Sequence, residues 1–449
     1  MTVADRPTDL PIEELSSSEL IARARELGEF AWEHIGATEA DRRLPDAVIQ
    51  ALLDSGLLRL ATSRRMGGLE AHPLTLVEVG RELARGSAAL GWIYGLTAGH
   101  QWYLSFAHEQ LQQEVRDSGP GLIVDSLVPG GQAEIVDGGY LLSGHWKFVS
   151  GVEWCSWAGL AFVPPNANPP RPIVAFVPGG QAEVVDGGYL LTGHWKFVSG
   201  VEWCSWAGLA FVPPDANPPR PIVAFVPAEQ LSIEDTWRTV GLRGTASNEV
   251  TLDRAYVPQH RIFQLAKFAH DSIPQGEVVE PGTLFKLPFM GMAAIHLAYT
   301  SLGVAQRAIE EFTHWTKVRV RAYEHTEAKE APYSQLTLAD AIAKWDAAHA
   351  LLLQYCRDMW EAAEAGRCAL PDDVRARMFA QRAFIARTCA ELTNQLFLDS
   401  GAMSLFETSA MQQLWRDANA ASMHMVLGRG DALTSFGRTL MGLPGHPFA

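Results

Sequence analysis

The chain has 449 residues, of which 47% are hydrophobic and 19% charged, a composition typical of globular proteins that bury a core. Its formal net charge of −15 argues against nucleic acid or an anionic membrane as a partner. The five cysteines form no C-x-x-C motif and no Cys/His metal spacing, so we expect neither a disulfide framework nor a zinc site. The N-terminus is acidic and lacks the features of a secretory signal, and no apolar run is long enough to cross a bilayer, which predicts a cytoplasmic protein.

A helical domain is predicted over residues 1–120, because apolar residues recur there every three to four positions. The first helix has Leu20, Ala24, Leu27 and Ala31 on one face, and Ser17 or Ser18 is placed to cap it. Four further segments continue this pattern: 44–58, 72–86, 87–106 and 108–115.

A central β domain is predicted over residues 121–262 from short stretches rich in β-branched and aromatic residues, separated by Gly and Pro. The expected strands are 122–128, 134–142, 146–152, 157–163, 171–177, 236–244 and 248–258.

A 49-residue block stands twice within this domain, at 129–177 and at 178–226, with only three differences between the copies. Solenoid repeats need at least three stacked units, so we interpret the block as a tandem duplication. We expect one copy to occupy the sheet. The other should be an extra lobe, an extension of the sheet edge, or poorly ordered.

Long helices return in a C-terminal bundle predicted over residues 283–449. The helical segments are 291–320, 336–366, 371–401 and 409–442. Pro371 and Gly401 are typical residues for the start and the end of the third segment.

The order of helical domain, small β domain and four-helix bundle resembles the acyl-CoA dehydrogenase fold, an α+β fold that is mostly α. The segments that carry the resemblance are RRLPDAVIQALLDSGLL, GHWKFVSGVEWCSWAGLAFV, TWRTVGLRGTASNEVTLDRAYVP, LGVAQRAIEEFTHWTKVR and LWRDA. It covers nearly the whole chain apart from the extra copy of the block.

Two chemistries compete within that fold. Acyl-CoA dehydrogenases and oxidases need a Glu base; counting back from Arg416 gives Glu407, whereas alignment through Gly401 places Thr408 there. Two-component flavin-dependent monooxygenases, such as the oxygenase components of 4-hydroxyphenylacetate hydroxylase and dibenzothiophene monooxygenase, are more similar. The similar features are a His in GWIYGLTAGHQW (His100), the string GLRGTASN, and a His after WRDA (His424).

The resemblance implies hydroxylation of an aromatic or polycyclic small molecule through a flavin C4a-hydroperoxide. It also implies reduced flavin (FMNH2 or FADH2) from a separate reductase, and a homotetramer. No Rossmann G-x-G-x-x-G is present, which agrees with a flavin bound between domains. The alternatives are an acyl-CoA dehydrogenase or oxidase, an N-oxygenase of an amine on the same fold, and a protein whose duplication has abolished turnover.

Four residues are candidates for catalysis. His100 is a base or orienter for a phenol-like or N–H substrate, because imidazole titrates near neutral pH; the alternative is a buried helix histidine bonded to a carbonyl. Ser150 or Ser199, in the two FVSG turns, is expected near flavin N5, although Ser-Gly also simply ends strands. His424 is expected to hydrogen-bond the flavin or its hydroperoxide.

Cofactor binding is expected mainly from the GLRGTASN segment, where glycines allow close approach of the backbone and Arg243 offsets negative charge. Asp417 is expected to hold Arg416 or to cap the following helix. The full set of candidates for flavin binding is Trp146, Trp195, Arg243, Thr245, Ser247, Arg307 and Arg416.

Overall fold

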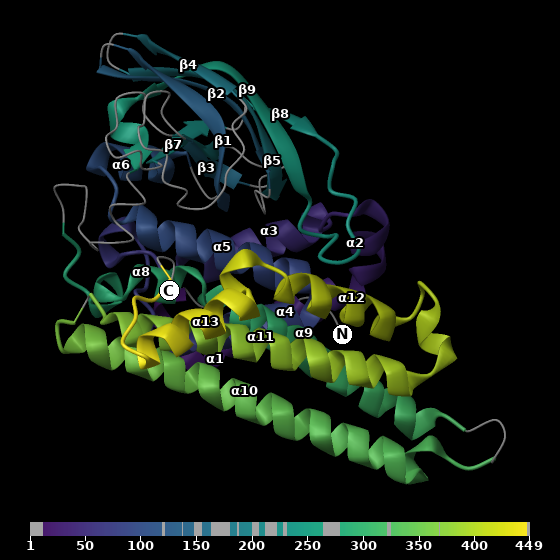
Figure 1. The fold of residues 1–449 in the computed structure, drawn as a ribbon. Helices are drawn as coiled ribbons and strands as arrows, with labels where there is room; N and C mark the ends of the chain where they lie inside the picture. The colour runs from purple at the N-terminus through teal and green to yellow at the C-terminus, as the bar shows by residue number, and fades with distance from the viewer. Residues whose placement is uncertain are drawn as a thin grey trace.

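A computed structural model shows a β-sheet packed at one end of a helical assembly (Figure 1). The described residues are 12–118, 122–136, 138–147, 155–162, 180–185, 188–199, 206–211, 222–227, 231–263, 279–320, 325–367 and 369–446. In Figure 1 the strands lie at the top, the long helices of the C-terminal part lie at the bottom, and helix α5 lies between them.

The N-terminal part is helical, and each predicted segment is confirmed as a helix. The predicted cap, Ser17 or Ser18, is wrong: Ser16 caps the first helix by forming a capping box with Glu19, so the helix begins at Ser17. The buried face of that helix is the predicted one, with Leu20, Ala24, Leu27 and Ala31. The elements are η2 (Ile12–Glu14), α1 (Ser17–Glu33), α2 (Ile35–Asp41), α3 (Asp46–Asp54), η3 (Leu57–Arg59), η4 (Arg64–Met66), α4 (Pro73–Gly86), α5 (Ala88–Leu104) and α6 (Glu109–Asp117).

The central strands form one ten-stranded sheet in the order β10-β7-β3-β6-β1-β2-β5-β9-β8, with β4 paired to β5. The strands are β1 (Leu122–Val136), β2 (Gly138–Lys147), β3 (Cys155–Phe162), β4 (Gly180–Val185), β5 (Gly188–Ser199), β6 (Trp206–Phe211), β7 (Ile222–Pro227), β8 (Leu231–Glu234), β9 (Ser247–Pro258) and β10 (Ile262–Phe263). The 3-10 turn η7 (Gln259–Arg261) joins the last two.

Both copies of the repeated block contribute strands to the interior of this sheet. The expectation that one copy occupies the sheet while the other is an extra lobe, an extension of the sheet edge or poorly ordered is therefore wrong. Strand β2 of the first copy pairs in parallel with β5 of the second, with Lys147 opposite Lys196. Both strands also pair with β9, where Trp146 and Trp195 each lie opposite Val250. Identical strands have the same backbone edge and the same alternation of side chains, so either copy fits the same register.

Residues 236–244, predicted as a strand, belong instead to a loop, which we call the 236–246 loop. Leu242 and Ala246 have φ values of 53° and 42°, in the left-handed region that ends a strand. The Asn248 side chain accepts hydrogen bonds from the backbone N–H groups of Thr236 and Trp237, at 3.0 and 2.9 Å. These bonds replace the ladder contacts that a strand would make.

The C-terminal part is a helical bundle in which two predicted helices are interrupted. Segment 291–320 breaks at Ala294, and segment 409–442 divides into three elements. Within the described residues, every helix is too short or too polar to serve as a transmembrane span. The elements are η8 (Thr283–Lys286), α8 (Phe289–Ala293), α9 (Ile295–Val318), η9 (Ala328–Glu330), α10 (Pro332–Glu364), α11 (Asp372–Ser400), η10 (Ala402–Leu405), α12 (Ala410–Ser422), η11 (Met425–Leu427) and α13 (Arg429–Leu440).

The 236–246 loop is fixed to helix α12. The Asp417 carboxylate accepts a hydrogen bond from the Leu242 N–H at 2.7 Å, and the Arg416 guanidinium donates to the Val240 carbonyl at 2.8 Å. A Cβ on Gly241 would lie 2.4 Å from the Arg416 carbonyl oxygen, so only glycine allows this approach. Asp417 therefore anchors the loop from the middle of α12, and the prediction that it holds Arg416 or caps a helix is wrong.

Asp417 makes the stability of this anchor dependent on pH. Burial, followed by the negative charge of Glu39, raises the pKa of Asp417 from 3.8 to about 7. The folded protein therefore holds this proton more tightly than the unfolded chain, and the stability that it contributes is lost as pH rises from about 4 to about 7.

Asp417→Asn cannot ionise and keeps an oxygen for the Leu242 N–H. We expect the melting temperature of this variant to exceed that of wild type at pH 8, and the difference to shrink at pH 5.

Calorimetric melting between pH 5 and pH 8 measures this difference. Asp417→Ala is the control: it cannot ionise either, but it leaves the Leu242 N–H unsatisfied, so it should be less stable than Asp417→Asn by about 1–3 kcal/mol at every pH. A constant difference between wild type and Asp417→Asn across the pH range would contradict the prediction.

Candidate active site

One face of helix α5 borders open space, although the helix is otherwise buried. Trp92, Leu96, Gly99 and His100 lie on this face, because they are spaced by three, four, seven and eight residues. A Cβ added to Gly99 would meet no heavy atom within 4 Å, and Leu96 and Gly99 are partly exposed. A ligand approaching α5 would therefore meet this face first.

His100, one of the predicted catalytic residues, lies at the junction of α5 and β1. Its Nδ1 lies 2.6 Å from the carbonyl oxygen of Ile123, the second residue of β1. Because a carbonyl only accepts hydrogen bonds, Nδ1 must carry the hydrogen, and Nε2 of the neutral ring holds the lone pair. The backbone thus sets His100 as an acceptor of a hydrogen bond or a proton at Nε2.

In His424, the second predicted histidine, the hydrogen is on the other ring nitrogen. His424 caps the short helix η11, and its Nδ1 accepts the Val426 N–H at 3.4 Å. Nε2 of the neutral ring therefore carries the hydrogen and is a donor. The residue is accessible, yet enclosure by protein lowers the pKa of its imidazole to about 4. Both observations agree if His424 lines the wall of an enclosed space.

A third histidine, His296 at the start of α9, was missed by the sequence analysis. The indole of Trp92 joins it to His424, with ring centroids 5.9 Å from His296 and 5.7 Å from His424. Burial, and then the charges of His424 and His100, lower the pKa of His296 to about 3. A Cβ on Gly95 would lie 2.3 Å from the Cβ of His296, so this histidine fits only against glycine. In the sequence His296 is one of many polar residues on this helix, so no distinctive signal marked it.

The serine strand and the GLRGTASN segment come together at the end of β5. The Thr245 and Ser247 hydroxyl oxygens are 2.6 Å apart, and Thr245 also donates to the Leu242 carbonyl at 2.9 Å. The backbone of Ser199 pairs with Ser247. Ser150, the equivalent serine of the first copy, lies outside the described residues. Trp146 and Trp195 are placed by their backbones only, near the ends of β2 and β5.

The three candidate arginines all lie near carboxylates. Arg307 pairs with Glu29 at 2.9 Å, and Arg416 pairs with Glu39 at 2.5 Å. Both arginines are buried, and each joins the C-terminal bundle to an N-terminal helix. Arg243 is the more accessible of the three, with 34% of its side chain exposed and 3.9 Å between it and Glu39. Of the three, Arg243 is therefore the one most available to a ligand.

The carboxylate of Glu407, the candidate base of the competing dehydrogenase reaction, does not reach the cluster of His100, His296 and His424. Glu407 is exposed on the turn between η10 and α12. Burial lowers the pKa of His424, and burial together with the neighbouring His424 and His100 lowers the pKa of His296, with no contribution from a described carboxylate. The arrangement provides two imidazole acceptors and one imidazole donor, with His296 and His424 joined through Trp92.

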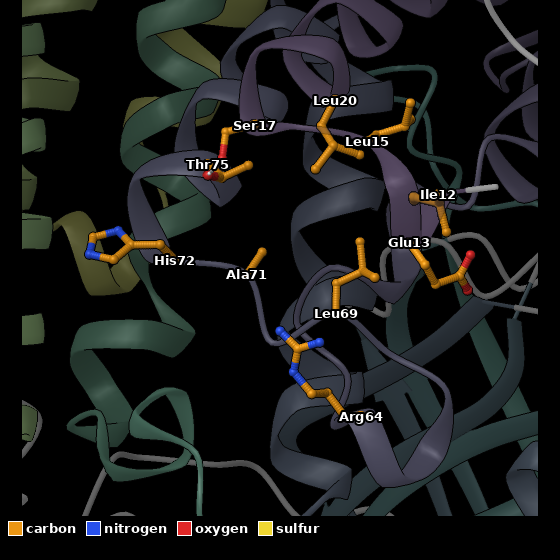
Figure 2. Close-up of a pocket in the computed structure, with 10 residues that line it drawn as sticks. All are labelled: Ile12, Glu13, Leu15, Ser17, Leu20, Arg64, Leu69, Ala71, His72 and Thr75. Carbon is orange, nitrogen blue, oxygen red and sulfur yellow. Dashed lines mark hydrogen bonds between the residues drawn. The ribbon is translucent and has the colours of Figure 1, made fainter. Parts of the chain in front are cut away.

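A separate pocket of about 180 Å³ opens among the N-terminal helices (Figure 2). Its hydroxyl groups bond each other, with Thr75 donating to Ser17 at 2.9 Å, and the His72 ring packs on Trp360 at 4.4 Å. Glu13 is paired with Arg59. Because these polar groups are already engaged, we do not assign chemistry to this pocket.

Comparisons with known proteins agree with this architecture. The family model of the acyl-CoA dehydrogenase N-terminal domain matches residues 17–116, and that of the acyl-CoA dehydrogenase C-terminal domain matches residues 295–429. The oxygenase component of an FADH(2)-dependent resorcinol hydroxylase from Rhizobium sp. (strain MTP-10005) is 29% identical over 414 residues, which cover 90% of each chain.

A second relative is the flavin-dependent monooxygenase, oxygenase subunit HsaA, of Mycobacterium tuberculosis. It is 28% identical over 412 residues, which cover 91% of each chain. The crystal structure of the HsaA monooxygenase from M. tuberculosis superposes with a TM-score of 0.79 and 26% identity, covering 97% of this chain and 100% of that one. The two family models together match more than half of the residues, and the chain belongs to the acyl-CoA dehydrogenase family.

Proposed function

We propose that the protein is the oxygenase component of a two-component flavin-dependent monooxygenase that hydroxylates an aromatic small molecule. The observation that carries this proposal is that two histidines have opposite hydrogen-bonding roles at Nε2. His100 has a lone pair there, and His424 has a hydrogen. Hydroxylation of a phenol needs both, an acceptor for the substrate hydroxyl and a donor beside the oxygen to be transferred. The names of the relatives from Rhizobium and M. tuberculosis support the same activity.

Reduced flavin is the cofactor that we propose for this site. The partly exposed Leu96 and Gly99 leave room beside α5 for a planar ring. The Thr245 and Ser247 hydroxyls are buried and bond each other, so they would have to exchange these bonds to contact the ring. Because the Rhizobium relative is named for FADH(2), we propose reduced FAD, delivered by a separate reductase. When bound, the flavin supplies the electrons that activate dioxygen and passes on one oxygen atom. Ser199 and Ser247 would lie at its edge, and Arg243 would offset its negative charge.

His100 acts on the substrate. Its Nε2 accepts the hydroxyl proton of a phenol, which makes the aromatic ring electron-rich at the carbon that gains oxygen. The hydrogen bond from Nδ1 to the Ile123 carbonyl prevents the ring from turning and stabilises the imidazolium that forms. Since His100 is 5% exposed, bulk water does not compete for this proton.

His424 acts on the oxygen atom. Its Nε2–H donates a hydrogen bond and holds that atom in place. Because the pKa of His424 is about 4, the ring stays neutral at physiological pH and cannot release a proton. A neutral donor therefore orients the oxygen without promoting its loss as hydrogen peroxide.

We further propose a homotetramer formed through the C-terminal helices. Apolar side chains are exposed in succession on the last turn of α11, on η10 and just after it: Leu398, Met403, Leu405 and Phe406. A monomeric protein seldom exposes so many large apolar groups within so short a segment. Contact between copies of the chain would cover them.

His100→Ala should lower hydroxylation about a hundredfold or more, because the substrate proton then has no acceptor. Binding of reduced flavin should change little. Turnover with a phenol and anaerobic titration of reduced flavin measure the two effects. His108→Ala, which removes the exposed N-cap of α6, is the control. Equal losses of turnover and of flavin binding would contradict the assigned role.

His424→Leu should convert product formation into release of hydrogen peroxide, because the donor beside the oxygen is lost. His424→Gln retains a side-chain N–H and should recover much of the yield. In wild type, titration of His424 should not change the yield of product per flavin consumed between pH 6 and pH 8, since the pKa of His424, about 4, lies below this range. Product and peroxide assays per flavin consumed measure the yield. A folded His424→Gln protein as poor as His424→Leu would refute the donor role.

The double change Leu405→Glu and Phe406→Glu should dissociate the tetramer, because it places charge in the proposed interface. Light scattering after size exclusion measures the mass. Val279→Glu, at an exposed apolar residue before the bundle, is the control. An unchanged mass for the double variant, or a monomeric wild type, would exclude this interface.

A further inference from the structure

His296 carries an acceptor that nothing in the described structure satisfies. Its Nδ1 lies 2.9 Å from the Ala293 carbonyl oxygen, so Nδ1 carries the hydrogen and Nε2 holds the lone pair. Nε2 is closed off from solvent and has no hydrogen-bond partner. A buried acceptor without a partner costs about 1–3 kcal/mol, so a group that donates to it is expected in some state of the protein.

The surroundings of His296 place this acceptor at the wall of the proposed active site. The residue is 8% exposed, and the Trp92 indole lies edge-on against both His296 and His424. Gly95 and Gly99 lie one turn apart on the facing helix; Gly95 admits the His296 ring, and a Cβ added to Gly99 would meet no described atom within 4 Å. Because Nε2 of His296 is covered in this structure, a ligand group that enters beside the Trp92 indole has to uncover it in order to bind there.

Its chemistry differs from that of His100. With a pKa of about 3, His296 stays neutral at any working pH and cannot keep a proton from the substrate. It can only accept a hydrogen bond. The backbone has thus oriented a permanent acceptor, and the ligand must bring an O–H or N–H group to it.

We propose that His296 accepts a hydrogen bond from a second hydroxyl group of the aromatic substrate, so that the site selects arenes with two hydroxyl groups over those with one. The inference rests on the proposed function, since it assigns the first hydroxyl to His100. A site that binds a hydroxyl through a buried group discriminates strongly against a ligand without it, because the buried group is then left unpaired.

The test compares a benzenediol (each of the three isomers in turn) with phenol. Titration calorimetry on the flavin-free protein measures affinity, and steady-state turnover with reduced flavin measures kcat and KM. In wild type we expect at least one diol to bind about tenfold more tightly than phenol or better, as one net hydrogen bond provides. His296→Leu should remove this preference by weakening the diol and leaving phenol unchanged. The loss should appear in KM more than in kcat.

Two further variants separate a specific role from a structural one. His296→Gln keeps an acceptor oxygen and should recover part of the preference. Thr316→Val removes another buried polar atom without a partner on the same helix, far from His296, and should leave the preference intact. The pH profile of turnover should be the same for wild type and His296→Leu.

Each alternative result has a distinct meaning. Equal weakening of diol and phenol by His296→Leu would overturn the inference alone and would indicate a structural role or a bound water. A shifted pH profile would overturn it too, because it would make His296 a base. If wild type hydroxylates neither diol nor phenol, the proposed function fails and the inference fails with it. A wild type that binds diol and phenol equally overturns the inference without any variant.

Discussion

Helix α5 is buried along almost its whole length between β1 and α9, and this burial sets the conditions for every polar group on it. Apolar residues there need only fill space, but each imidazole at its surface needs a partner. Backbone groups provide those partners, from Ile123 for His100, from Ala293 for His296 and from Val426 for His424. Because each partner fixes one ring nitrogen, the fold decides which histidines accept and which one donates. The chemistry of the site thus follows from the backbone groups that β1, α8 and η11 present to the three imidazoles.

The helices around α5 are held by ion pairs as well as by apolar packing. Arg85 contacts Glu82 at 3.0 Å and Glu310 at 2.8 Å, and thereby connects α4 to α9. Burial works to raise the pKa of Glu82, but Arg25, Arg81 and Arg85 outweigh it and lower the pKa. A buried pair of this kind is weak evidence for added stability, yet removal of one partner leaves an uncompensated charge. The network therefore fixes the relative positions of helices that carry the histidines.

The helices and most strands were predictable from sequence because apolar periodicity and Gly/Pro punctuation are local signals. Residues 236–244 were not, because the left-handed Leu242 and the anchor from Asp417 depend on contacts with a helix far away in the chain. His100 and His424 came from resemblance, and the structure adds the direction of their hydrogen bonds. His296 escaped notice because its meaning depends on an unpaired atom, which only tertiary packing reveals. That both copies of the repeat join the sheet was also beyond local reasoning, since the copies have nearly the same pattern.

The repeat has a consequence for how the chain reaches its final state. Strands β2 and β5 pair with the same residues of β9. The pattern of side chains normally specifies the register in which a strand pairs. Here that information is degenerate, because a displacement by 49 residues presents nearly identical side chains to β9. The side chains of β2 and β5 therefore do not determine which of the two strands pairs with β9 first while the chain folds.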